Sequence, residues 1–283
     1  MIIWPAIFGA RAPALVSNIW ATMSPAPIML EGGGALCHNG GNFIYALEGH
    51  NSHVFIRYSI PGNAWVFMAP TPSAPWAGGA LSYTEGDFIY ALVGSVTNLF
   101  MRYSISGNTW VFMTSAPNVV WDGGALSHTV NGFIYALAGG ASTAFMRYNI
   151  LGNTWIFMAA VPGKVNWGGS LVHIGGDFIY AFRGGGFTDF WRYSIPLNTW
   201  IAMASTPAPV GAGGALAVSG NFIYAFAGGG TNHFWRYSIP LNTWTAMAST
   251  PAAVWRGGAL TPSGNFIYAT AGGGTNHFWR YNI

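Results

Sequence analysis

The chain has 283 residues, of which 52% are hydrophobic, 16% aromatic and only 6% charged, with a formal net charge of +3. The high apolar content excludes a disordered chain, and its apolar runs are far shorter than the roughly 20 residues that a membrane-spanning helix needs. The ten basic residues form no cluster, which argues against nucleic-acid binding, and the single Cys37 excludes an intramolecular disulfide.

The N-terminal stretch MIIWPAIFGARA belongs to no repeat. It contains a short apolar run but lacks the basic n-region of a signal peptide. We therefore interpret residues 1–14 as a retained apolar extension. Its apolar side chains could form an assembly arm that lies across a neighbouring subunit: Ile2, Ile3, Trp4, Ile7 and Phe8.

Three landmarks recur along the remaining chain at intervals of about 45 residues, a period typical of solenoids and propellers. The first is a tryptophan in NTW-like segments: Trp20, Trp65, Trp110, Trp155, Trp200 and Trp244. The second is GGAL or GGSL, which begins at Gly33, Gly78, Gly123, Gly168, Gly213 and Gly257. The third is the FIY tripeptide, which ends at Tyr45, Tyr90, Tyr135, Tyr180, Tyr224 and Tyr268.

Each repeat contains four short segments with the composition of β-strands, here called a to d: GGAL, FIYAL, FMRYSI and TWVFM in the second unit or close variants elsewhere. Four antiparallel strands make one propeller blade, so residues 15–283 are expected to form a single, all-β, six-bladed propeller. The last repeat reaches only strand c at Tyr281, whereas residues 18–27 resemble a lone strand d. We expect Trp20 to complete the last blade, because ring closure pairs strand edges that would otherwise be exposed.

The repeat resembles that of the kelch-type β-propellers. The shared marks are a Gly-Gly after strand b, then a Tyr, then a Trp, as in Gly139-Gly140, Tyr148 and Trp155. Two units depart from this pattern, with EGH at 48–50 and VGS at 93–95. The resemblance implies a fold more than a function, since kelch propellers include protein-binding modules, sugar-active enzymes and a copper oxidase.

Variation among the six repeats is concentrated in the b–c and d–a loops, which share one face of a propeller, whereas the c–d loop barely changes. Loops on a rigid scaffold commonly carry binding sites. The candidate ligand-binding residues on this face are Trp76, Trp121, Trp167, Trp255, Arg256, His53, Asp189, His233 and His277. The tryptophans could stack on sugar rings, anchor a protein partner, or simply wedge between blades; the histidines could bind a ligand or lie in solvated turns.

Other repeated or polar residues have mainly structural interpretations. The arginines before the strand-c tyrosines are expected to contact backbone carbonyls and aromatic faces: Arg57, Arg102, Arg147, Arg192, Arg236 and Arg280. His38, His128 and His173 share one position on strand a but do not form a symmetric triad, so neither a metal nor a cofactor is predicted. The acids available on the variable face for glycosidase chemistry are Glu31, Glu48, Asp122 and Asp189, and they fall in several blades.

The low charge content favours a protein that associates with itself, because a surface with few charges promotes association. The leading hypothesis is a non-catalytic, extracellular or cell-surface propeller that self-assembles into an oligomer or polymer. The first alternative is a lectin-like module that binds a glycan, or another protein, on the variable face. The second is a sugar-modifying enzyme.

Overall fold

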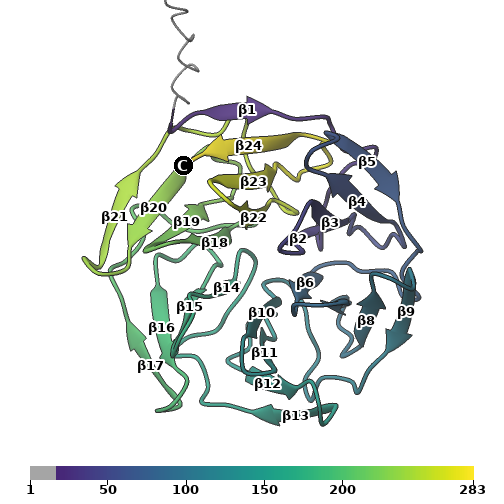
Figure 1. Cartoon of the computed structure of the whole chain (residues 1–283). Helices are drawn as coiled ribbons and strands as arrows, with labels where there is room; N and C mark the ends of the chain where they lie inside the picture. Colours follow the sequence, from purple (N-terminus) through teal and green to yellow (C-terminus); the bar gives the residue numbers. More distant parts are fainter. Residues whose placement is uncertain (1–16) are drawn as a thin grey trace, which may run out of the picture.

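The computed structural model describes residues 17–283, which form six four-stranded antiparallel sheets around a central axis (Figure 1). This confirms the predicted six-bladed propeller. Within these residues no helix is long and apolar enough to cross a membrane.

The blades follow one another along the chain, and each runs from an inner strand at the axis to an outer strand at the rim. Blade 1 consists of β2 (Ala35–His38), β3 (Phe43–Leu47), β4 (Phe55–Ser59) and β5 (Ala64–Phe67). Blade 2 consists of β6 (Ala80–Tyr83), β7 (Phe88–Leu92), β8 (Phe100–Ser104) and β9 (Thr109–Phe112). Blade 3 consists of β10 (Ala125–Thr129), β11 (Phe133–Leu137), β12 (Phe145–Asn149) and β13 (Thr154–Phe157).

The second half of the ring repeats this arrangement. Blade 4 consists of β14 (Ser170–His173), β15 (Phe178–Phe182), β16 (Phe190–Ser194) and β17 (Thr199–Ala202). Blade 5 consists of β18 (Ala215–Ser219), β19 (Phe222–Phe226), β20 (Phe234–Ser238) and β21 (Thr243–Ala246). Blade 6 consists of β22 (Ala259–Ser263), β23 (Phe266–Thr270), β24 (Phe278–Asn282) and the N-terminal β1 (Trp20–Thr22).

The ring is closed by β1, which pairs antiparallel with β24 at the rim (Figure 1). Trp20 lies opposite Tyr281, as predicted from the missing strand of the last repeat. The Trp20 ring packs edge-on against Phe234 of blade 5 with centroids 4.9 Å apart, the same contact that Trp110 makes with Phe55. The closing strand therefore reproduces the packing found within the continuous part of the chain.

A buried aromatic layer joins each blade to the next. At the interface of blades 1 and 2, Phe55 packs edge-on against both Tyr103 and Trp110, and Tyr45 stacks on Phe55 from the same blade. Edge-to-face pairs of this kind stabilise a core beyond the apolar area that they bury. Because equivalent contacts occur around the ring, the core is a set of inter-blade layers.

The NTW-like segments link the blades with hydrogen bonds as well as with rings. Asn108 has a φ of 48°. Its side-chain oxygen accepts bonds from the Tyr103 hydroxyl at 2.7 Å and from the backbone N–H of Ala69 in blade 1 at 2.9 Å. The indole of Trp110 donates to the Ala69 carbonyl at 3.1 Å. The repeated Asn and Trp side chains therefore bind both the backbone N–H and the backbone carbonyl of one residue in the preceding blade.

The repeated arginines on strand c lie over the phenylalanine rings that start strand b, with guanidinium-to-centroid distances of 4.2–4.3 Å in all six blades. Arg57, for example, covers Phe43. The expectation that these arginines contact aromatic faces is confirmed. The six side chains are part of the blade packing, because guanidinium groups stack favourably on aromatic faces.

Candidate functional site

The mouth of the central channel is built by the d–a and b–c turns, which lie on one face as predicted. In every blade the carbonyl of the residue before Gly-Gly accepts a bond from the b–c turn, as in Ser95 N–H to Ala77 at 3.0 Å. The Gly-Gly pairs are needed because the turns of adjacent blades touch through their backbones. A Cβ on Gly78 would lie 2.1 Å from the carbonyl oxygen of Trp121.

The two units that lack the double glycine, blades 1 and 2, keep its first glycine. Gly49 and Gly94 have φ values of 78° and 69°, and a Cβ on either would collide with the d–a turn of the same blade. The next position is occupied by His50 or Ser95, each with positive φ. Blades 1 and 2 therefore keep the turn found in the other blades.

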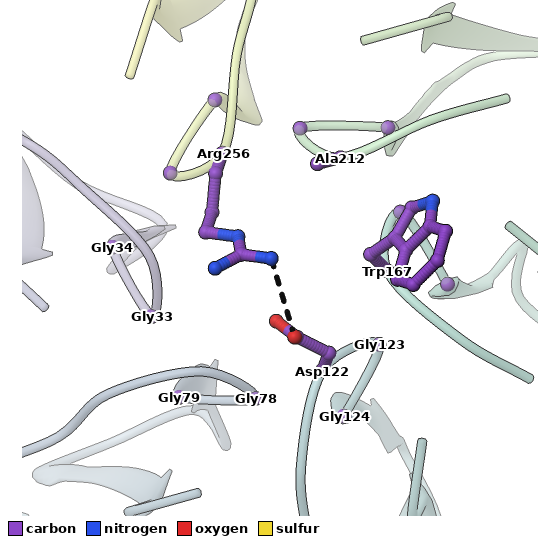
Figure 2. A pocket seen from close by; sticks show the side chains of 16 residues that line it. Gly33, Gly34, Gly78, Gly79, Asp122, Gly123, Gly124, Trp167, Ala212 and Arg256 are labelled. Atoms are coloured by element: carbon purple, nitrogen blue, oxygen red, sulfur yellow. Dashed lines mark hydrogen bonds and ion pairs between the residues drawn. The ribbon is translucent and has the colours of Figure 1, made fainter. Parts of the chain in front are cut away.

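The residues directly before each Gly-Gly form a ring around the mouth: Gly32, Ala77, Asp122, Trp167, Ala212 and Arg256. Figure 2 shows Arg256 and Asp122 reaching toward each other across the opening, with Trp167 beside them. The two charged groups form an ion pair at 3.3 Å. They come from blades 6 and 3, on opposite sides of the ring. The residues at three other positions of the ring, Gly32, Ala77 and Ala212, are small and leave space for these two side chains.

A hollow beside the ion pair lies between the turns of blades 2 and 3. It is lined by Trp76, Ala77, Ser95, Val96, Trp121, Asp122 and Arg256. Exposed indole and valine surface forms most of its wall, and the ion pair supplies the charged groups. A mainly apolar wall with a few polar groups is the usual character of a small-molecule site.

All four candidate tryptophans are surface residues, with 41–52% of their area exposed. Trp76 and Trp121 line the hollow, and Trp167 stands at the channel mouth. Trp255 contributes backbone contacts to Gly213 and lies against the b–c turns at Gly230 and Gly273. Trp76, Trp121 and Trp255 occupy the same repeat position, whereas Trp167 lies one residue later. The structure places only Trp76 and Trp121 of the four in the hollow.

The candidate histidines lie further out on the b–c loops. His53 contacts the carbonyl of Thr71, while His233 and His277 lie against Trp235 and Trp279. The histidine nearest the mouth is His50, which pairs with Glu31 at 2.7 Å and lies edge-on to Trp76. His50 was not among the predicted site residues, and no repeat marks it, since the equivalent positions are Ser95 and glycines.

Each acid on this face has its own partner. Asp122 pairs with Arg256, Glu31 with His50, and Asp189 with Arg183 at 3.0 Å. Arg183 also lies over the ring of Phe187. Glu48 accepts a hydrogen bond from the Ser52 hydroxyl. The candidate Asp189 is therefore part of a local cluster in blade 4 and is absent from the lining of the hollow.

The polar residues on strand a are held by local contacts. The His38 ring contacts the Gly41 carbonyl at 2.7 Å and the Ser263 hydroxyl at 3.1 Å. Burial lowers the pKa of His38 and His128 and raises the pKa of the buried Cys37 thiol. Within residues 17–283, no group of three or more His, Cys, Asp or Glu side chains could hold a metal ion.

Comparison with known proteins identifies the fold. No protein-family profile and no curated protein sequence matches the chain. Among solved structures, that of YjhT, a kelch-repeat protein, superposes with a TM-score of 0.73 at 14% sequence identity, covering 93% of this chain and 96% of the other. The fold is a six-bladed kelch-type propeller. At this level of identity the likeness concerns architecture alone.

The rim of this kelch-type propeller is a second candidate surface. Blades 1 to 3 end in outer strands with neighbouring exposed apolar side chains: Val66 and Phe67, Val111 and Phe112, Ile156 and Phe157. The three phenylalanines are 54–64% exposed. In blades 4 and 5 the phenylalanine is replaced by Ala202 and Ala246. Ile201 of blade 4 is also exposed, but the exposed phenylalanines are confined to blades 1 to 3.

Proposed function

We propose that the protein is a non-catalytic building block of an extracellular or cell-surface assembly, and that its partner is another copy of itself. The observation that carries this proposal is the apolar arc on the outer strands of blades 1 to 3. Three equivalent phenylalanines are exposed there, whereas the same position is Ala in two other blades.

The backbone of the arc also favours association. The outer strands β5, β9 and β13 pair on one side only among residues 17–283, so each presents a row of free N–H and C=O groups. Soluble proteins usually protect such edges with Lys, Pro or bulges. The strand sequences AWVF, TWVF and TWIF contain no charged residue or proline.

The predicted assembly arm, Ile2, Ile3, Trp4, Ile7 and Phe8, lies outside the described residues. Its apolar composition is consistent with a second contact between copies. The non-catalytic part of the proposal is supported by the partners of Glu31, Glu48, Asp122 and Asp189, since each acid is engaged in a separate contact.

The test is the mass of the particle in solution, measured by light scattering and sedimentation over a range of concentrations. Wild-type protein should form dimers or larger species. The triple variant Phe67→Ala, Phe112→Ala, Phe157→Ala should be largely monomeric. It should still fold, because alanine is the native residue at this position in blades 4 and 5.

A matched control removes three apolar side chains that are more exposed than the phenylalanines, from the c–d loops on the other face: Leu151→Ala, Leu197→Ala, Leu241→Ala. This variant should assemble like wild type. A chain lacking residues 1–14 measures the separate contribution of the arm. A wild-type protein that stays monomeric at the highest concentration would contradict the proposal.

A further inference from the structure

We propose that the hollow between the turns of blades 2 and 3 binds one neutral, hydroxyl-bearing ring, namely a sugar residue of a glycan. This site is on the mouth face, and it is independent of the rim that carries the proposed self-assembly. Its lining comes from Trp76, Val96, Trp121, Asp122 and Arg256, with Ala77 and Ser95 between them.

The apolar wall suits the face of a sugar ring. Trp76 and Trp121 expose 45% and 47% of their area, and Val96 exposes 49%. Indole faces bury the C–H groups of a ring while the hydroxyls at its edge stay free to form hydrogen bonds. Two large aromatic side chains on adjacent turns therefore offer the stacking surface that a pyranose needs.

The ion pair supplies the polar contacts. Arg256 uses one guanidinium nitrogen on Asp122, and 49% of its side chain is exposed compared with 19% for Asp122. A guanidinium has five N–H donors and a carboxylate has about four acceptor positions, so both groups keep capacity for ligand hydroxyls. Neighbouring hydroxyls on a sugar can both accept from Arg256 and donate to Asp122.

The same pair selects against charged ligands. A quaternary ammonium group would be attracted to the indoles, but it would meet the positive charge of Arg256. An anion that pairs with Arg256 would meet the carboxylate of Asp122. Because the two charges cancel at 3.3 Å, a neutral ligand keeps the ion pair intact.

The backbone at the edge of the hollow is strained. Ser95 and Val96 have φ values of 57° and 59°, a region that β-branched residues rarely adopt. Glycine occupies the position of Val96 in blades 4 to 6, as Gly186, Gly230 and Gly274. A strained residue that places an apolar side chain on a pocket wall is consistent with binding.

Among the six blades of residues 17–283, the pairing of tryptophans that builds this hollow occurs once. Only the turns of blades 2 and 3 place a tryptophan on both sides, since the position of Trp76 and Trp121 is occupied by Glu31, Asn166 or Gly211 in three of the other blades. The turn of blade 6 that carries Trp255 meets the turn of blade 1, where the same position is Glu31. The expected stoichiometry is therefore one sugar per chain.

The experiment is titration of the full chain with glucose, galactose, mannose, fucose and N-acetylglucosamine, followed by NMR and tryptophan fluorescence, with a glycan array in parallel. At least one neutral sugar should bind with one site per chain. Trp76→Ala and Trp121→Ala should each lower the association constant about fivefold or more. Trp255→Ala removes an equally exposed indole outside the hollow and should leave binding unchanged.

Choline and acetate serve as charged probes and should bind more weakly than the best sugar. Failure of every neutral sugar to bind would overturn the proposal, as would tighter binding of choline or acetate, or an equal loss in Trp255→Ala. The rim variant Phe67→Ala, Phe112→Ala, Phe157→Ala should keep sugar binding. Loss of assembly and loss of binding are therefore separate outcomes.

Discussion

At the scale of single residues, the channel mouth depends on glycines that take positive φ and touch a neighbouring backbone. Gly78 combines both features, with φ of 88° and its α-carbon against the Trp121 carbonyl of the next blade. Gly86, in the a–b turn of the same blade, has φ of 73° but nothing within 4 Å of an added Cβ. Substitutions at Gly78 and Gly86 therefore separate the cost of a positive φ from the cost of a steric collision.

Gly78→Ala should lower the free energy of unfolding by about 3 kcal/mol or more, because the chain must relieve a backbone collision as well as strain. Gly86→Ala should cost only about 1 kcal/mol, the penalty for a left-handed alanine. Urea unfolding followed by tryptophan fluorescence measures both. Equal losses in the two variants would show that the turns of neighbouring blades are not in backbone contact.

At the scale of secondary-structure elements, the short strand β1 closes the ring. It has three residues, yet it pairs with β24 and carries Trp20 into the aromatic layer between blades 5 and 6. The Trp20 indole also donates to the Ala248 carbonyl at 2.9 Å, and Asn18 accepts from the Tyr281 hydroxyl. The closing segment thus provides the same indole bond to the preceding blade and the same Tyr–Asn bond as the other outer strands.

Trp20→Ala should destabilise the protein by about 3 kcal/mol, since it removes a packed indole and its hydrogen bond. Hydrogen exchange should also become faster at β24, because β1 is held less firmly beside it without the Trp20 indole. Trp255→Ala, which alters a half-exposed ring at the mouth, should cost less, about 1 kcal/mol. Unchanged exchange at β24 in Trp20→Ala would argue against closure through β1.

At the scale of the whole molecule, a ring of buried tyrosines couples stability to pH. Burial raises the pKa of Tyr58, Tyr103, Tyr148 and Tyr281 to about 12, and it raises the pKa of Tyr193 and Tyr237 in the same direction. Each hydroxyl donates to the asparagine two residues before the outer-strand tryptophan, as in Tyr148 to Asn153 at 2.8 Å. All six interfaces therefore respond to the same change.

The folded state favours neutral tyrosine, so its stabilising contribution is complete below pH 10 and is lost as the pH rises from 10 toward 12. The free energy of unfolding should fall over this interval in urea titrations at a series of pH values. Tyr148→Phe should make the decline shallower, because one titrating group is removed. Constant stability up to pH 11.5 or so would contradict this coupling.

The sequence by itself determined the number of blades, the four strands in each, the closing role of Trp20 and the face that carries the variable loops. These features follow from local patterns that recur at a fixed spacing and from the need to pair strand edges. The same repeats also led to the prediction that the strand-c arginines lie on aromatic faces, as Arg57 does on Phe43.

Only the tertiary structure decided which residues meet at the mouth. Asp122 and Arg256 are 134 positions apart and come from opposite blades, and no spacing in the chain indicates that their side chains span the opening. In the sequence, Asp122 is one of four acids on the variable face, and Trp76, Trp121 and Trp255 occupy one repeat position while Trp167 lies one residue later. Whether a side chain spans the opening depends on the diameter of the ring and on the small residues at Gly32, Ala77 and Ala212. A repeat pattern encodes neither.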